Sequence, residues 1–405
     1  MPTRYLVLYA DAPVDNPREA ASASFWRRTR SRRGPSQLSL STLDGHEHDA
    51  GQLRADPKNV AVMDADSLFS LVTPKVRKAV ANANIDDALT TLGGQRMAKG
   101  LAAVGAHASN FTGQGVKVAV LDTGLDKTHP AFADKQIASR DFTGAGASGD
   151  DVADRDGHGT HCAGTICGAV VDGVRVGVAP GVTRLCVGRV LGPSGGSLEM
   201  LLQGMLWAVF EQKSDIVSMS LGYDLPGNIA RLVDRGVKPA LAGQAAMQLQ
   251  NEIITGIRTL RAFLSSQAPN VVFLAATGNE SERPGFVLGA GLPAAELFAV
   301  GAVGASGDKW AVAEFSNGRA QCVAPGVDVV SAAAGGGWAT MSGTSMATPH
   351  AAGVAALWVE KLRAKGELAL PDAVRAALLA SAAREPLVDF DLDAIGAGMI
   401  KAPAQ

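Results

Sequence analysis

The run VKVAVL, residues 116–121, decides the fold class of the chain. It is apolar on both faces, and four further runs share this texture and its richness in β-branched residues: TRLCVGRV (183–190), DIVSMS (215–220), VVFLAA (271–276) and LFAVGAV (297–303). Strands that are apolar on both faces are typical of a parallel sheet covered on each side. Helical segments such as 197–212 alternate with these runs. From residue 113 to residue 405 the sequence therefore predicts a doubly wound α/β domain, in which helices cover both faces of a mainly parallel sheet.

The composition is that of a globular protein. Of the 405 residues, 47% are hydrophobic and 19% are charged, which argues against intrinsic disorder. The formal net charge is −2 at pH 7, so no overall field attracts nucleic acid or an anionic membrane surface. No apolar run approaches the ~20 residues of a membrane-spanning helix. We therefore expect neither nucleic acid nor a membrane as a partner.

The N-terminus and the cysteines bear on the location of the protein. The first apolar run, Tyr5 to Ala10, is shorter than the roughly 7–15 apolar residues of a secretory signal. A cytoplasmic location is therefore expected, with secretion by another route left open. The cysteines have mostly small or apolar neighbours and show no disulfide framework, which predicts buried free thiols at Cys162, Cys167, Cys186 and Cys322.

The first hundred residues differ in texture from the rest. Residues 1–75 read as a small α+β region, with strands at 4–10 and 59–65, and residues 76–112 read as a linker and the start of the main domain. Residues 66–92 carry helical spacing. Five arginines within residues 27–33 predict a solvated loop first, a processing site second and a nucleic-acid contact third.

Two helical segments of the main domain stand out. Residues 228–268 form a helical stretch longer than a crossover between strands requires, which predicts a surface insertion. The helix that begins near Ser345 carries small and apolar residues all round, which is typical of a buried helix.

Four polar side chains lie where the predicted strands end or the helices begin. Asp122 directly follows the strand at 116–121, and Asn279 comes three residues after the strand at 271–276. His158 precedes one helical stretch and Ser345 begins another. In an open α/β sheet, ligands bind outside the carboxyl ends of the strands. The topology therefore predicts that all four meet at one edge of the sheet.

These residue types suit acyl transfer. A serine hydroxyl such as that of Ser345 needs a base before it can act as a nucleophile, and His158 is the candidate. Asp122 would accept a hydrogen bond from the other ring nitrogen and fix the tautomer. Asn279 would donate to the developing oxyanion, together with the backbone N–H of Ser345.

In these motifs the chain resembles the subtilase family, the subtilisin-like serine endopeptidases. The order Asp, His, Ser is that family's order. The resemblance covers residues 100–405 and rests on segments quoted as they stand here: VAVLDTG (118–124), HGTHCAGTICG (158–168), SMSLG (218–222), ATGNE (276–280) and GTSMATPHAAG (343–353). It implies catalytic roles for Asp122, His158 and Ser345, and an oxyanion role for Asn279.

The resemblance also implies how a peptide binds. Subtilases add an extended peptide as a strand beside the active site. One binding edge resembles Gly195, Gly196 and Ser197, and the other resembles Ser220, Leu221 and Gly222. Ala276, Thr277 and Gly278 would form the far wall of the primary specificity pocket, whose small residues imply a broad or apolar preference.

Further implications concern regulation and ions. Many subtilases carry an N-terminal propeptide that occludes the cleft, which implies that residues 1–75 act as an intramolecular inhibitor or else as an accessory extension. The resemblance implies that no cofactor is needed for the chemistry and that a structural calcium ion is compatible with the fold. Cys162 resembles the free thiol behind the catalytic His in the proteinase K branch. Tyr223 and the insertion at 228–268 depart from the family pattern, which puts the substrate preference in doubt.

The sequence also bears on a metal site and on other functions. His158 and His161 are three residues apart, but no HExxH pattern or paired cysteine spacing supports zinc. Asp126 reads as a calcium ligand or as a loop carboxylate. A catalytically silent relative that serves as a binding scaffold is the competing function, and an esterase of the α/β-hydrolase type lacks its GxSxG elbow.

Overall fold

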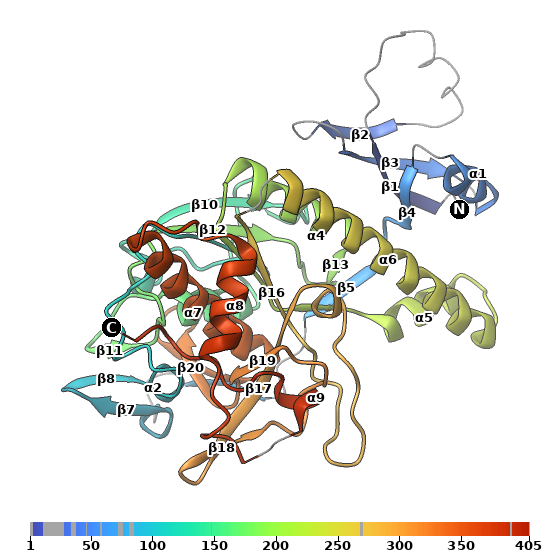
Figure 1. Cartoon of the computed structure of the whole chain (residues 1–405). Coiled ribbons are helices and arrows are strands. Elements are labelled where there is room, and N and C mark those ends of the chain that lie inside the picture. The colour runs from blue at the N-terminus through green and yellow to red at the C-terminus, as the bar shows by residue number, and fades with distance from the viewer. Residues whose placement is uncertain are drawn as a thin grey trace.

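The structure is a computed structural model of the chain (Figure 1). It describes residues 3–10, 28–33, 38–45, 47–56, 59–71, 76–80, 85–146, 148–267, 270–388 and 391–404, and all structural statements below concern these residues. No helix in these ranges is both long enough and apolar enough to cross a membrane.

The centre of the molecule is an eight-stranded sheet. Its order is β10-β12-β9-β14-β16-β17-β18, and β19 pairs with β17 beside this path. Every pair is parallel except β17 with β18. The mainly parallel sheet predicted from the apolar runs is thus confirmed. Its strands are β9 (Lys117–Asp122), β10 (Gln136–Asp141), β12 (Arg184–Arg189), β14 (Ile216–Met219), β16 (Val272–Ala276), β17 (Phe298–Ser306), β18 (Lys309–Val312) and β19 (Cys322–Pro325).

Helices cover both faces of this sheet, as predicted (Figure 1). Alternate residues of β9 point to opposite sides, so Val118 and Val120 join one core cluster while Ala119 and Leu121 join another. The first cluster contains α3 (His158–Cys167), α7 (Thr344–Ala364) and α8 (Pro371–Ser381). The second contains α4 (Leu198–Leu206), which continues as a π-helical segment over Trp207–Glu211, and α6 (Pro239–Gln267). In α7, every residue from Thr344 to Leu357 is buried, as its composition predicted.

Shorter elements complete the main domain. Paired strands at its margins are β7 (Leu89–Leu92), β8 (Gln95–Ala98), β11 (Val174–Arg175), β13 (Gly196–Ser197), β15 (Leu221–Tyr223), β20 (Val329–Ala332) and β21 (Trp338–Ser342). The short helices are α2 (Lys99–Ala103) and α9 (Leu392–Ile395), with 3₁₀ turns at Asp86–Ala88, Pro130–Phe132 and Ala294–Glu296. The four cysteines are free and buried, which confirms that prediction.

The N-terminal region forms its own antiparallel sheet, in the order β2-β3-β1-β4. The strands are β1 (Thr3–Ala10), β2 (Arg28–Arg33), β3 (Leu38–Gly45) and β4 (Asn59–Asp64), with α1 (Glu47–Ala55) between β3 and β4. The expected basic loop at 27–33 is wrong for Arg28–Arg33, which form the edge strand β2; residues 11–27 and 34–37 lie outside the described ranges. An arginine-rich edge strand is one way in which a sheet avoids pairing with other chains.

The helical insertion contains α5 (Leu225–Asp234) and α6, and it carries the N-terminal sheet (Figure 1). Met63 of β4 is fully buried in the same cluster as Ile253 and Ile257 of α6. Gly256 lies so close to the Met63 side chain that a Cβ atom there would overlap it. The surface insertion predicted from the sequence is therefore a platform on which the N-terminal region rests.

The helical spacing at 66–92 is a wrong prediction. The described residues there form β5 (Leu68–Leu71), β6 (Val76–Val80), a 3₁₀ turn and β7. β7 forms a hairpin with β8, but β5 and β6 pair with distant strands: β5 lies between β13 and β15, and β6 lies against β21. Helical spacing is a local signal, and here the edges offered by distant strands override it.

Candidate active site

Asp122 and His158 form a buried hydrogen-bonded pair. Asp122 is the last residue of β9, and His158 is the first residue of α3. The Nδ1 atom of His158 lies 2.8 Å from Oδ1 of Asp122, and neither side chain is exposed. The same Oδ1 also accepts from the backbone N–H of Thr123 at 2.7 Å. The imidazole is thus held through Nδ1, and its Nε2 has no hydrogen-bond partner.

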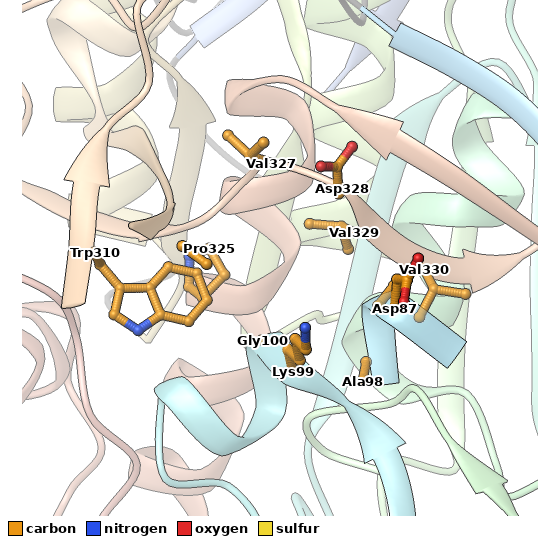
Figure 2. Close-up of a pocket in the computed structure, with 12 residues that line it drawn as sticks. Asp87, Ala98, Lys99, Gly100, Trp310, Pro325, Val327, Asp328, Val329 and Val330 are labelled. Carbon is orange, nitrogen blue, oxygen red and sulfur yellow. The ribbon is translucent and has the colours of Figure 1, made fainter. Parts of the chain in front are cut away.

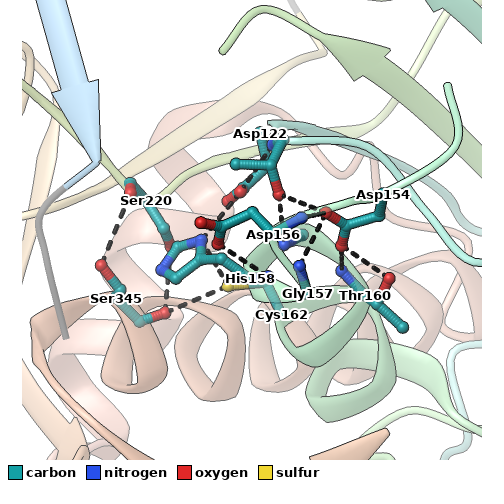
Figure 3. Close-up of polar contacts among 11 residues, drawn as sticks. Asp122, Asp154, Asp156, Gly157, His158, Thr160, Cys162, Ser220 and Ser345 are labelled. Carbon is teal, nitrogen blue, oxygen red and sulfur yellow. Dashed lines mark hydrogen bonds and ion pairs between the residues drawn. The ribbon is translucent and has the colours of Figure 1, made fainter. Parts of the chain in front are cut away.

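A network around Asp154 holds the two loops of this pair together. Its Oδ1 accepts from the hydroxyl of Thr123 at 2.9 Å and from the backbone N–H of Gly157 at 2.9 Å. Its Oδ2 accepts from the backbone and the hydroxyl of Thr160, at 2.9 and 2.7 Å (Figure 3). The sequence pattern assigns Asp154 no role in the site. Its bonds instead connect the residue after Asp122 with the first turn of α3, and they position His158.

Glycines make this close approach possible. Gly157, which precedes His158, has φ 92°, a conformation that other residues rarely adopt. A Cβ atom on Gly159 would overlap the carbonyl oxygen of Gly124, so the start of α3 can lie directly on the loop after Asp122 only with glycine there.

Ser345 is the second residue of α7 and is fully buried. Its hydroxyl donates to the carbonyl oxygen of Ser220 at 3.4 Å, a long bond. Its own carbonyl accepts from the hydroxyl of Ser220 at 3.0 Å and from the thiol of Cys162 at 3.5 Å. Figure 3 shows the imidazole of His158 between Asp122 and Ser345. The structure therefore brings the three predicted groups together in the predicted order.

Asn279 lies beside the start of α7. Its side-chain oxygen accepts from the backbone N–H and the hydroxyl of Thr344, both at 2.9 Å. The hydroxyl of Thr344 in turn accepts from the backbone N–H of Gly278 at 3.2 Å. Because Thr344 holds the oxygen end of the Asn279 amide, the NH₂ end is the one presented away from Thr344. This amide is adjacent to the backbone N–H of Ser345, the next residue along α7.

Asn317 shapes the loop that carries Asn279, and sequence reasoning missed it. Its NH₂ group donates to the carbonyl of Thr277 at 3.1 Å and to the Glu280 carboxylate at 2.7 Å. Its oxygen accepts from the backbone N–H of Ser281 at 3.0 Å. The segment FSNGR (315–319), in which Asn317 lies, carries no separate sequence signal of this role.

The charges favour a protonated His158 at low pH. Burial, the largest single cause, lowers the pKa of His158, but the charge and hydrogen bond of Asp122 together with the contact with Cys162 outweigh it and hold the pKa well above the usual value of 6.5. Cys162 lies 3.9 Å from Nδ1 of His158, and burial raises the pKa of its thiol. The thiol is therefore neutral at pH 7 and acts as a packing partner behind the imidazole.

The neighbouring histidines are core residues. The Nε2 atom of His161 lies 2.9 Å from the carbonyl of Val329 and 3.2 Å from that of Ala339, and burial lowers its pKa to about 3. His350 bonds through Nδ1 to the carbonyl of Met346 at 2.8 Å, and burial lowers its pKa to about 4. Both are uncharged at neutral pH, and His161 ties α3 to the β20–β21 hairpin.

The residues expected to bind substrate lie on or beside three strands, β13, β15 and β16. Gly196 and Ser197 form β13, Leu221 and Gly222 belong to β15, and Gly195 precedes β13. The strand β5 lies between these two edges and is antiparallel to both, with Phe69 opposite Gly196 and Leu71 opposite Leu221. The chain's own residues 68–71 thus complete a three-stranded sheet there. At the far side, Ala276 ends β16, and Thr277 and Gly278 follow it.

The bulky residue Tyr223, which departs from the family pattern, packs against Phe69. Phe69 is almost fully buried, and its ring meets that of Tyr223 edge-on, with centroids 5.8 Å apart. The Tyr223 hydroxyl donates to the carbonyl of Ala246 in α6 at 3.5 Å. The bulky residue therefore joins β5 to the insertion.

Two cavities differ in their relation to these residues. One of about 420 Å³ adjoins the pair of Asp122 and His158, and its walls include Ser70, Thr123, Asp156 and Arg189. The other, of about 130 Å³, lies between α2 and β19–β20, and Trp310, Pro325 and Lys99 line it (Figure 2). None of Asp122, His158, Asn279 and Ser345 lines either cavity, but only the first is lined by residues that are close to them in the sequence, Thr123 and Asp156.

Among the described residues, one group could offer a metal ion three ligands, namely Asp122, His158 and Cys162. Their hydrogen bonds to one another already account for this proximity. Asp126 lies in the loop after β9, where its carboxylate accepts from Thr128 at 2.6 and 2.9 Å and from the backbone of Gly335 at 2.8 Å.

Comparison with known proteins identifies the family. The family model described as the subtilase family matches residues 113–398. The chain is a subtilase. It is 39% identical over 251 residues to an intracellular serine protease of Paenibacillus polymyxa, which covers 60% of this chain and 67% of that protein. It is 35% identical over 257 residues to the major intracellular serine protease of Bacillus subtilis, covering 62% of this chain and 70% of that protein.

A solved structure agrees with this assignment. The crystal structure of a cold-adapted subtilisin-like serine proteinase superposes with a TM-score of 0.53 at 28% identity, over 73% of this chain and 92% of that one. The subtilase described here is a serine endopeptidase that acts on polypeptides, and subtilase chemistry needs no cofactor.

Proposed function

We propose that this subtilase cleaves peptide bonds through an acyl-enzyme on Ser345, with His158 as the general base and acid. The observation that carries the proposal is the state of the imidazole. Its Nδ1 is bound to Asp122 at 2.8 Å, while its Nε2 is unpaired and faces Ser345. In subtilisin itself, a worked example of such triads, the same three residue types serve these roles.

The reaction follows from this arrangement. Nε2 takes the hydroxyl proton as Oγ of Ser345 bonds to the carbonyl carbon of the substrate. The imidazolium then returns that proton to the leaving amine nitrogen as the C–N bond breaks. A water molecule then bonds to the acyl carbon while Nε2 takes one of its protons. The imidazolium returns that proton to Oγ of Ser345 as the ester bond breaks and the acid leaves. Asp122 stays ionised and stabilises the imidazolium in both halves.

Asn279 is proposed to stabilise the tetrahedral intermediate. Its amide is oriented through Thr344 and lies next to the N-terminus of α7, where backbone N–H groups add positive potential. The NH₂ of Asn279 and the N–H of Ser345 would donate to the oxyanion. Such donors act on charge that develops only in the transition state, so they raise turnover more than affinity.

The substrate is proposed to bind as β5 does. An extended peptide would pair with Gly195–Ser197 on one side and with Ser220–Gly222 on the other, by β-augmentation. The next side chain toward Ser345 would enter a pocket between Ser220–Gly222 and Ala276–Gly278. Phe69 marks a second apolar subsite, because this side chain is buried against Tyr223.

The N-terminal region is proposed to be an intramolecular inhibitor. Residues 68–71 occupy the edges that a substrate needs, and the sheet of residues 3–64 rests on α6. The proposed inhibitory region corresponds to the N-terminal unit at 1–75, which the sequence predicts to be followed by a linker and the start of the main domain at 76–112. Two relatives are named intracellular proteases, which supports an intracellular site of action. Neither nucleic acid nor a membrane is proposed as a partner, and a structural calcium ion stays without assigned ligands.

Labelling with a fluorophosphonate probe tests the proposal. The probe should react with the wild-type chain once its N-terminal segment has been removed, and the label should map to Ser345. The Ser345→Ala variant, folded to the same thermal midpoint, is the matched control and should take up no label. A folded, processed chain without label at any pH from 6 to 10 would favour the alternative, a catalytically silent scaffold.

A further inference from the structure

The loop between β16 and β17 exposes three large apolar residues in a row. Phe286, Val287 and Leu288 are 60%, 40% and 39% exposed. Elsewhere in the part of the chain that the structure describes, exposed large apolar side chains are never adjacent in the sequence. Single apolar residues are common on a protein surface, whereas a run of them lowers solubility and is typical of a surface that binds something. We call these three residues the apolar loop surface.

Both ends of this loop are anchored beside the residues proposed to bind substrate. The loop begins after Asn279, and near its end the backbone N–H of Gly291 donates to the carbonyl of Thr277 at 2.8 Å. The carbonyl of Leu292, the next residue, accepts from the backbone N–H of Tyr223 in β15 at 2.9 Å. The apolar loop surface is therefore continuous with both sides of the proposed specificity pocket, although its own residues are not part of the pocket walls.

The loop is held in one conformation by its own hydrogen bonds. The backbones of Glu282 and Phe286 exchange two hydrogen bonds, at 2.8 and 3.0 Å. The N–H of Leu288 donates to the hydroxyl of Ser281 at 3.0 Å, and its carbonyl accepts from the N–H of Gly318 at 2.7 Å. The apolar loop surface is thus ordered before any partner binds, which lowers the entropic cost of binding.

The chemistry of the surface indicates its partner. Three adjacent apolar side chains offer neither a charge nor a side-chain hydrogen bond, so they fit an apolar segment. The chain is an endopeptidase that acts on polypeptides, and a polypeptide in its active site comes close to this loop. An unfolded polypeptide exposes apolar segments that a folded protein buries.

We propose that the apolar loop surface is an exosite, which binds an apolar segment of the polypeptide substrate outside the residues that enter the active site. This inference rests on the proposed function and extends it to the choice of substrate, because such an exosite favours unfolded chains over folded ones. The segment stays bound in the ground state and in the transition state alike. The exosite therefore lowers KM and leaves kcat unchanged.

Two variants form a matched pair for the test. Phe286→Ser removes the largest and most exposed side chain of the apolar loop surface. Leu368→Ser removes a side chain that is 76% exposed in the turn between α7 and α8, away from this loop. Neither side chain is buried and neither belongs to the catalytic machinery, so both variants should keep the thermal midpoint of the wild type and its kcat/KM on a short peptide.

The readout is the KM of each processed enzyme for two long peptides. Both contain the same cleavable sequence, joined through a flexible Gly-Ser linker of about 12 residues to either three apolar residues or three serines. The linker is attached before the cleavable sequence in one series and after it in another.

In at least one series, the wild type and Leu368→Ser should show a KM about tenfold lower for the apolar peptide, since its apolar side chains leave water. The difference should fall to about threefold or less in Phe286→Ser, with kcat unchanged throughout. The same difference in Phe286→Ser and the wild type, or no difference in the wild type in either series, would overturn the exosite.

Competition separates the exosite from the active site. An uncleavable peptide that carries only the linker and the three apolar residues should raise the KM of the long apolar peptide and leave hydrolysis of the short peptide unchanged. Inhibition of both would place the apolar segment in the active site and overturn the proposal. So would a dimer in the wild type that becomes a monomer in Phe286→Ser, because the surface would then bind a second copy of the chain.

The short peptide distinguishes this proposal from the proposed function. If the short peptide is cleaved while the KM differences are absent, the exosite alone is overturned. If the short peptide is not cleaved and Ser345 takes up no fluorophosphonate label, the proposed function is overturned and the exosite with it.

Discussion

The catalytic side and the N-terminal side of this subtilase are built in different ways. Around α3 and α7 the residues are small and fully buried, and the polar groups are fixed by short bonds such as those of Asp122 and Asp154. The N-terminal region is instead joined through edge strands, the apolar contact of Met63 with α6 and a few ion pairs, among them Arg231–Asp64 at 3.2 Å and Arg54–Glu252 at 2.7 Å. The difference teaches that the catalytic groups are held in place before substrate binds, whereas the N-terminal region that blocks the site is held by contacts that can be broken.

The largest effect is expected at Ser345. Ser345→Ala should lower kcat by about 10⁶, the loss that the equivalent change causes in the subtilisin example. His158→Ala should cost about as much, and the double variant no more than either one, because the two groups act as a unit. Single-turnover and steady-state rates on one peptide measure this. Additive losses in the double variant would contradict the assigned roles.

Asn279→Ala should lower kcat by about 10²–10³ with little change in KM, since its donor acts on the oxyanion only. The change also removes the acceptor for Thr344. Thr344→Val is the matched control for that side effect, because it keeps the backbone N–H and removes the hydroxyl bond. If Thr344→Val lowered kcat as much as Asn279→Ala, the loss would reflect the loop rather than the oxyanion.

Inhibition by the N-terminal region should weaken most when its buried ion pair with the insertion is removed. The side chains of Arg231 and Asp64 are 15% and 6% exposed, so Arg231→Ala leaves the buried Asp64 carboxylate with the backbone N–H of Asp66 but without its ion-pair partner, at a cost of about 3–5 kcal/mol. The lag before the full chain hydrolyses a peptide should shorten at least tenfold. Arg54→Ala breaks a more exposed pair, worth about 0–1 kcal/mol, and should shorten it less than threefold. Equal lags in the two variants would show that the sheet does not control access.

The smallest effect concerns pH. Because the pKa of His158 is raised, the imidazole is protonated and cannot act as a base at low pH, so kcat/KM should rise with pH through a pKa above 6.5. The interaction with Asp122 stabilises the fold below that pKa and is lost as pH rises through it. In Asp122→Asn the acid limb of the profile should move to lower pH, in addition to the fall in rate. An unmoved limb would assign the titration to another group.

The sequence predicted those features that depend on local pattern. Five apolar runs gave the sheet, and the positions of Asp122, Asn279 and Ser345 relative to them gave the edge at which the site lies. The secondary structure of residues 66–92 could not be predicted from local pattern. The strands β5 and β6 form by pairing with strands far along the chain, which contain Gly196, Leu221 and Ser342. The same holds for Asn317, whose amide is important only because Thr277 and Glu280 lie beside it.

The central claim is that one serine becomes acylated because a histidine from another element removes its proton. The direct measurement is acid quenching of the processed enzyme during turnover of an activated ester, followed by mass spectrometry of the digested protein. The account predicts an added acyl mass on the peptide that contains Ser345, and none in His158→Ala quenched at the same time. An acyl group on any other residue, or equal acylation in His158→Ala, would contradict it.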